Sequence, residues 1–157
     1  MENYLSVLED SLKKKLQILD ELTACTAQQQ ELVQAEELDY EAFDGLVDQK
    51  DVLVQKLEEL DQGFEIVYDR IKEQLLDYKE QYAAQIKTLQ MLIGELTEKS
   101  VKLQAMEQRN KAAVEQQFRR SREKIRKGRL NQQAALNYYK NMNNSNYVPP
   151  QFLDNKK

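Results

Sequence analysis

The sequence predicts an all-α fold, either an antiparallel three-helix bundle or a hairpin of long helices, with an extended basic third helix and a disordered C-terminal tail. The first proline is Pro149, so almost the whole chain lacks the strongest helix breaker. Good helix formers, chiefly Gln, Glu, Lys, Leu and Ala, dominate the residues before it, and the chain has only four glycines. A chain of 157 residues, 41% of them hydrophobic, fits one domain with a modest core. We place this domain at residues 1–128, followed by a flexible tail at residues 129–157.

The first predicted helix covers residues 4–35. Apolar residues recur along it at alternating spacings of three and four, as they do on one face of a helix. This stripe consists of Leu5, Leu8, Leu12, Leu19, Leu22 and Val33. Lys15 and Gln29 interrupt its heptad positions, which favours packing inside a small bundle over an extended two-stranded coiled coil. A parallel dimeric coiled coil stays open as the alternative.

A turn is predicted at residues 36–39 and a second helix at residues 40–73. Asp39 is placed to cap the free amides of a helix start, and Leu38 and Phe43 have the spacing of a hydrophobic staple. The apolar stripe of this helix changes phase after Ile71. A single helix over residues 40–127 would be about 130 Å long, too long for a chain that must cover its own apolar face. We therefore expect a reversal near residues 72–80, with Gly63 as the rival site.

The third predicted helix covers residues 80–127, and its apolar stripe thins beyond Met106. Val114, Phe118 and Ile125 remain on a strongly basic helix, and we expect the domain to end near Gly128. Because the stripe is thin there, Phe118→Ala is expected to leave the melting temperature almost unchanged.

The tail beyond the third helix is polar, with Asn-rich and Pro-Pro segments typical of disorder. It contains the pair Tyr138 and Tyr139. Two alternatives stay open for this pair: docking on a partner protein, or a last helical turn that packs back on the bundle.

Charge is distributed unevenly along the chain. Residues 31–77 contain 15 acidic and 4 basic residues, whereas residues 109–129 contain 9 basic and 2 acidic residues. The basic helix either lies along acidic neighbours or faces a partner. Nucleic acid is not the expected partner, because the basic segment has a single aromatic residue and the chain has a net charge of −4. Its narrow apolar face also argues against a membrane-surface helix.

The residue types argue against catalysis. The chain has no His, and its one cysteine, Cys25, reads as a small core residue that no His can activate. There is no phosphate loop, dinucleotide fingerprint or cysteine cluster. We expect no enzymatic activity, no cofactor and no metal site.

The expected location is the cytoplasm. A single cysteine cannot form an internal disulfide, which fits a reducing compartment. The N-terminus lacks the pattern of a secretion signal, and no stretch approaches the roughly 18 apolar residues of a membrane span.

Over residues 4–127 the pattern resembles the FlgN family of flagellar export chaperones. One matching stretch places Lys50 ahead of Leu53 and Leu57, and reads QQQELVQAEELDYEAFDGLVDQKDVLVQKLEELD. The other places Asn110 ahead of Val114, and reads IGELTEKSVKLQAMEQRNKAAVEQQF.

The resemblance implies a chaperone of type III flagellar export. Such a protein binds the C-terminal helices of hook-filament junction (hook-associated) proteins, prevents their premature assembly and delivers them to the export gate. By position, Val114, Phe118 and Ile125 would bind the client. The family docks on the gate through a tyrosine near its C-terminus, to which Tyr138 or Tyr139 would correspond. The competing interpretation is a non-enzymatic coiled-coil scaffold that forms a homo-oligomer.

Overall fold

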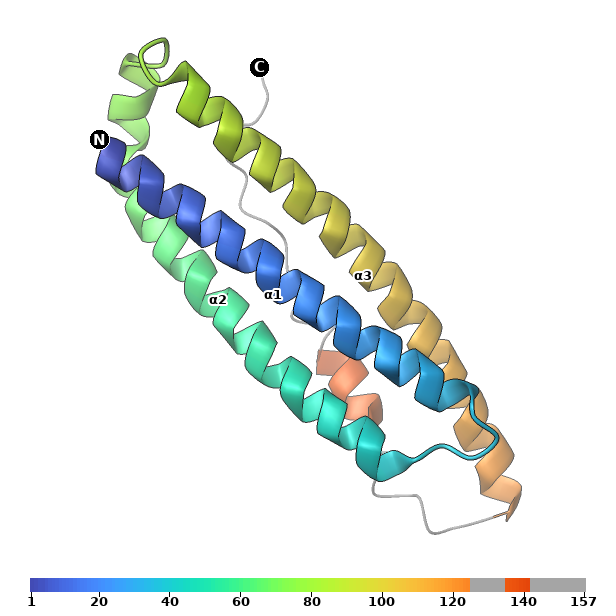
Figure 1. Ribbon diagram of the computed structural model, residues 1–157. Helices are drawn as coiled ribbons and strands as arrows, with labels where there is room; N and C mark the ends of the chain where they lie inside the picture. Colours follow the sequence, from blue (N-terminus) through green and yellow to red (C-terminus); the bar gives the residue numbers. More distant parts are fainter. Residues whose placement is uncertain (125–134, 142–157) are drawn as a thin grey trace. The chain divides into compact units, whose positions relative to one another are not determined.

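The computed structural model describes residues 1–124 and 135–141, and every regular element within these ranges is a helix (Figure 1). The helices are α1 (Glu2–Gln34), α2 (Tyr40–Asp77) and α3 (Ala83–Lys124). Residues 135–141 form a further short helix, which we call the tail helix. The predicted all-α class is confirmed.

The first turn lies where the sequence predicts it. The chain leaves the helical conformation after Gln34 and resumes it at Tyr40. The amide of Ala42 donates to Asp39 Oδ1 at 3.1 Å, so the carboxylate satisfies one of the free donors of the helix start. Leu38 and Phe43 are both buried, as the staple requires.

The second turn covers residues 78–82, at the end of the range expected for the reversal. It is formed by backbone hydrogen bonds without glycine or proline: the amide of Tyr78 donates to Gln74 O at 3.0 Å, and that of Tyr82 to Tyr78 O at 3.3 Å. Helix α2 therefore continues to Asp77, past the predicted end at residue 73. Gly63 lies inside α2, so the rival site for the reversal is wrong.

The chain divides into two compact units, and each long helix contributes to both. Unit 1 comprises, among the described residues, 1–20 and 54–100. Its core is built from all three long helices: Leu5, Leu8, Leu12, Ile18 and Leu19 from α1, Leu57, Phe64, Ile71 and Leu75 from α2, and Ile86, Leu89 and Leu96 from α3. In this unit the chain's own helices bury the α1 stripe, as expected for a bundle.

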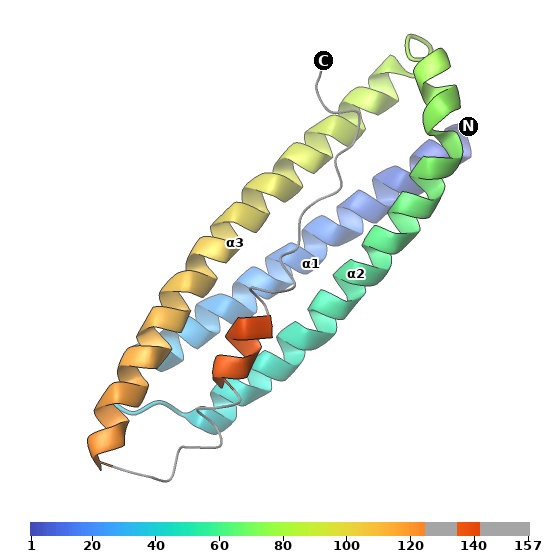
Figure 2. The same cartoon turned by 180° about the vertical axis from the view of Figure 1, so that it is seen from behind.

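Unit 2 comprises, among the described residues, 21–53, 101–124 and the tail helix. The tail helix lies between the unit 2 parts of α2 and α3 (Figure 2). The core of this unit contains Leu22, Cys25 and Val33 from α1, Leu38 from the turn, Phe43 and Leu46 from α2, Leu103, Val114 and Phe118 from α3, and Ala135, Tyr138 and Tyr139 from the tail helix. The α3 stripe thus continues into a packed core beyond Met106.

Across residues 1–124 and 135–141, no helix is both long enough and apolar enough to cross a membrane.

Candidate functional site

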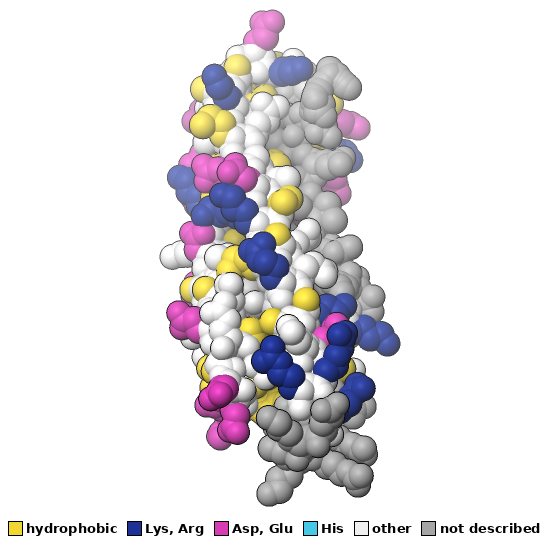
Figure 3. All heavy atoms as spheres, turned by 90° about the vertical axis from the view of Figure 1, so that its right-hand side faces the viewer, with side chains coloured by type: hydrophobic (Ala, Val, Ile, Leu, Met, Phe, Trp, Pro, Cys, Tyr) yellow, Lys and Arg dark blue, Asp and Glu magenta, His cyan; other side chains and the backbone are white. Residues whose placement is uncertain are grey.

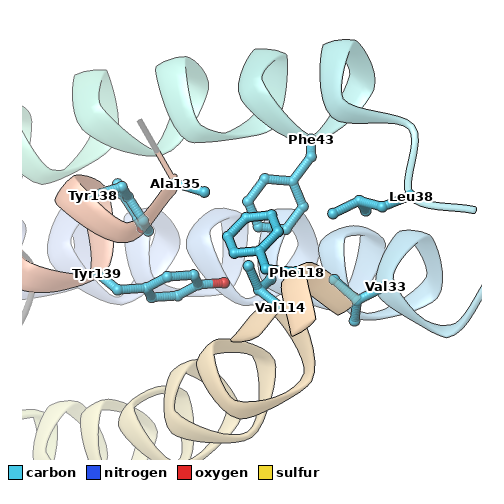
Figure 4. Close-up of a cluster of buried hydrophobic side chains, with 8 residues drawn as sticks. All are labelled: Val33, Leu38, Phe43, Val114, Phe118, Ala135, Tyr138 and Tyr139. Atoms are coloured by element: carbon cyan, nitrogen blue, oxygen red, sulfur yellow. The ribbon is translucent and has the colours of Figure 1, made fainter. Parts of the chain in front are cut away.

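The candidate site is a group of buried side chains in unit 2, which we call the aromatic cluster (Figure 4). Five elements contribute to it: the end of α1, the first turn, the start of α2, α3 and the tail helix. Its members are Val33, Leu38, Phe43, Val114, Phe118, Ala135, Tyr138 and Tyr139. The cluster brings together residues for which the family resemblance implies two separate roles, client binding for Val114 and Phe118 and gate docking for Tyr138 or Tyr139. Ile125 lies outside the described residues.

Val114 and Phe118 form the α3 side of the aromatic cluster. Their exposed fractions are 0% and 3%, so neither offers apolar surface to a partner in this arrangement. The Phe118 ring stacks on Tyr40, with ring centroids 5.9 Å apart and 14° between the planes. Phe118 therefore joins α3 to the start of α2.

Tyr138 and Tyr139 form the tail-helix side of the aromatic cluster. They are 6% and 2% exposed, and their rings meet edge to face at 5.2 Å. Tyr139 also lies 6.5 Å from the Phe43 ring, and Figure 4 shows it reaching toward Val114 and Phe118. Two alternatives were open for this pair, docking on a partner or a last helical turn that packs back on the bundle. In the structure the pair lies on a helical turn packed against the rest of unit 2.

The two tyrosine hydroxyls are buried and have no hydrogen-bond partner among the residues that the structure describes. Burial, together with the negative charge of Glu107, raises the pKa of both phenols well above its usual value, so both are neutral. A buried hydroxyl without a partner loses its hydrogen bonds to water. The tail helix is therefore held by its rings and not by its hydroxyls.

A buried polar group lies directly beside the aromatic cluster, and we call it the Lys50 network. The Lys50 side chain is fully buried and its Nζ forms an ion pair with Glu107 Oε1. Nζ also donates to Gln29 Oε1 at 2.8 Å, and Thr26 Oγ1 lies 2.8 Å from Glu107 Oε1. The network thus joins α1, α2 and α3.

Tyr138 completes the surroundings of the Lys50 ammonium. Nζ lies 4.9 Å from the centre of the Tyr138 ring, a cation–π distance. An ammonium group has three donors, and here it meets Gln29, Glu107 and this ring. Burial lowers the pKa of Lys50, while the Glu107 carboxylate opposes that change. The tail helix therefore covers an internal charge as well as apolar surface.

Two amide side chains of α3 bind the backbone of α1. Asn110 Nδ2 donates to Thr26 O at 2.9 Å. Gln117 Nε2 donates to Val33 O at 2.9 Å and to Ala35 O at 2.8 Å. The last carbonyls of a helix have no partner within it, so Gln117 supplies one for the end of α1.

Glu107, Thr26 and Gln117 were not predicted as site residues from the sequence. The available signal was their position, because Glu107 and Gln117 continue the buried face of α3 that holds Leu103 and Val114. Gln29, noted as an interruption, proves to be a buried member of the Lys50 network.

Lys15, the other interruption in α1, is also buried. In unit 1 its Nζ pairs with Asp61 and lies 5.0 Å from the centre of the Phe64 ring. The interruptions of the α1 stripe are thus buried polar contacts within the chain's own units.

Cys25 is a core residue of unit 2, as expected. Its thiol donates to Gln49 Oε1 at 3.6 Å, and burial raises its pKa, so the reactive thiolate is disfavoured. In the part of the chain that the structure describes, no group of three or more His, Cys, Asp or Glu side chains could hold a metal ion.

Exposed basic side chains accompany the cluster on α3. Arg109, Arg119, Arg120 and Arg122 are all exposed. Figure 3 shows a face with Lys and Arg side chains gathered in its lower part. Among the side chains that the structure describes, no ion pair joins these arginines to an aspartate or glutamate.

A protein-family model described as FlgN protein matches residues 1–146, a range that contains every described residue. No curated protein and no solved structure matches the chain significantly.

Proposed function

We propose a specific role for this chain, which belongs to the FlgN family and is thus a flagellar export chaperone. It binds the C-terminal helices of hook-filament junction (hook-associated) proteins in the cytoplasm. It keeps them from assembling prematurely and delivers them to the cytoplasmic domain of the export gate.

The observation that carries the proposal is the aromatic cluster of unit 2, in which a short helix lies against α2 and α3. Phe43, Val114 and Phe118 offer this helix an apolar surface. An amphipathic helix laid into an apolar groove is a general mode of peptide recognition that needs no covalent chemistry. A client whose terminal helix must be kept from self-assembly suits such a surface.

Val114, Phe118 and Ile125 are the proposed client-binding residues. The exposed arginines of α3 that follow Phe118, among them Arg119 and Arg122, favour a client helix that carries acidic residues beside its apolar face. Tyr138 and Tyr139 are the proposed docking residues for the export gate. Since both are buried against the cluster, docking requires that the tail helix leaves it.

The scaffold alternative has less support. A parallel dimeric coiled coil needs the apolar stripe of α1 for a second copy of the chain. Leu8 and Leu12 of that stripe are buried within unit 1, and Leu22 within unit 2.

Client binding is tested by titrating the full chain with the C-terminal helical fragment of a hook-associated protein from the same organism. Phe118→Leu, which removes the ring but keeps an apolar side chain, should weaken binding by about tenfold or more, because buried aromatic residues dominate small interfaces. The matched control is Tyr78→Leu, at an aromatic residue that is 53% exposed in unit 1. Equal affinities for the wild type and both variants would place the client elsewhere.

Gate docking is tested by a pull-down with the cytoplasmic domain of the export gate in the presence of the client fragment. The variant Tyr138→Ala/Tyr139→Ala should recover much less of the gate than the wild type, since anchoring rings carry much of the energy of a small interface. Recovery that does not change with the double substitution would remove the tyrosines from the docking role.

A further inference from the structure

We infer that the tail helix is an internal substitute for the client, and that the client helix which displaces it carries the same side-chain pattern. This pattern is a small residue followed, three and four positions later, by two large rings. In the tail helix these residues are Ala135, Tyr138 and Tyr139. The inference rests on the proposed function and specifies the partner of the same site.

The tail helix blocks access to the proposed client-binding side chains. Val114 and Phe118 are 0% and 3% exposed while the tail helix is in place. Protein cores are close-packed, so a second helix cannot reach these side chains without removing the first. Any client that binds Val114 and Phe118 therefore competes with the tail helix.

The tail helix has low intrinsic stability. The structure describes residues 135–141 of it as helical, and a helical segment of that length is marginal in water on its own, since isolated helices need about 12–15 residues. Its helical form thus depends on contact with the aromatic cluster. Its release is a local opening that leaves α1, α2 and α3 folded.

The side chain at the Tyr138 position faces the Lys50 ammonium, and this contact selects an aromatic ring. Tyr138 places its ring 4.9 Å from Lys50 Nζ, beside the ion pair with Glu107. An aliphatic side chain there would leave the ammonium without the electron-rich ring face. We therefore expect an aromatic side chain at this position of the client.

The Ala135 and Tyr139 positions also restrict the side chains that a client can place there. Ala135 and Tyr139 are four residues apart, so both project from one face of the helix, and both are 2% exposed. A larger side chain at the Ala135 position would overfill a close-packed cluster. At the Tyr139 position the hydroxyl finds no hydrogen-bond partner among the described residues, so a phenylalanine fits the same space better. The tail helix is thus a weaker occupant than a client with a phenylalanine there.

The test uses the full chain and a fluorescent peptide with the sequence of residues 131–145. The variant Tyr138→Ala/Tyr139→Ala, whose own tail no longer competes, should bind this peptide about tenfold or more tightly than the wild type does. The same peptide with phenylalanine in place of both tyrosines should bind more tightly still, and one with alanine at both should not bind. The matched control Tyr78→Ala should behave as the wild type. Equal binding by the wild type and the double variant would overturn the inference.

Adding the client fragment of a hook-associated protein separates the inference from the proposed function. Displacement of the fluorescent peptide from the double variant supports both. Binding of the fragment without displacement overturns the inference and leaves the proposed function standing. Failure of the fragment to bind any form of the chain, while the peptide still binds, overturns the proposed function and the client's part of the inference.

A measurement on the wild-type chain keeps the test decisive if the double variant does not fold. With saturating client fragment, the amides of residues 135–141 should lose their protection against hydrogen exchange. Full retention of that protection with bound client would overturn the inference.

Discussion

Glu107→Leu should lower the free energy of unfolding by about 3–5 kcal/mol, because it leaves the Lys50 ammonium buried without its anion. The Lys50 side chain is 0% exposed and that of Glu107 is 8% exposed, so water cannot replace the lost partner without opening unit 2. Restoring the balance should restore stability: the double variant Lys50→Met/Glu107→Leu, in which both charges are absent, should regain most of the loss. Urea denaturation of Lys50→Met, of Glu107→Leu and of the double variant measures the energetic coupling between Lys50 and Glu107.

The matched control is the pair of Lys99 and Asp20 in unit 1. The Lys99 Nζ and Asp20 Oδ1 atoms are 2.6 Å apart, but the two side chains are 38% and 63% exposed. Asp20→Asn should therefore cost at most about 1 kcal/mol. A cost for Glu107→Leu as small as that of Asp20→Asn would show that the Lys50 network is hydrated and does not hold the helices together.

The turns illustrate how far local sequence determines this fold. At the first turn, Asp39 caps the start of α2 and Leu38 and Phe43 are buried as a hydrophobic staple, as local sequence predicted. At the second turn, the change of phase in the apolar stripe indicated a reversal without fixing its residue. The chain turns at Tyr78 through backbone hydrogen bonds, for which side-chain types give no signal.

The aromatic cluster was predicted only in its parts. Val114 and Phe118 were expected to face a client, and Tyr138 and Tyr139 to face the gate or pack back. Nothing in the sequence joins the two pairs, because residues 135–141 contain too few apolar positions to reveal a periodic face.

The pairing within the Lys50 network could not be predicted from the sequence either. Taken singly, Lys50, Gln29 and Glu107 are polar interruptions of three separate apolar stripes. Their pairing depends on the register of three helices, which is a property of the packed unit. The sequence could therefore indicate a bundle from Gln29 but could not name the partner of Lys50.

Phe118→Ala should lower the free energy of unfolding by roughly 3–5 kcal/mol, the usual cost of removing a buried aromatic ring. This differs from the expectation based on the thin apolar stripe, because Phe118 is 3% exposed and stacks on Tyr40 at the start of α2. Its loss should resemble that of Leu57→Ala in the core of unit 1, for which about 2–5 kcal/mol is expected.

Tyr139→Ala tests whether the tail helix is less important for stability than the α3 residues of the same aromatic cluster. Tyr139 is as deeply buried as Phe118, at 2% exposed, but it belongs to the short tail helix. Once that helix is released, further loss of its contacts cannot destabilise α1, α2 and α3, so the cost of Tyr139→Ala is limited to the free energy of docking the tail helix. Urea denaturation followed by circular dichroism should therefore rank Phe118→Ala and Leu57→Ala as severe and Tyr139→Ala as mild. If Tyr139→Ala proves as damaging as Phe118→Ala, the tail helix is an integral part of the core of unit 2, and a client that displaces it would have to unfold that unit.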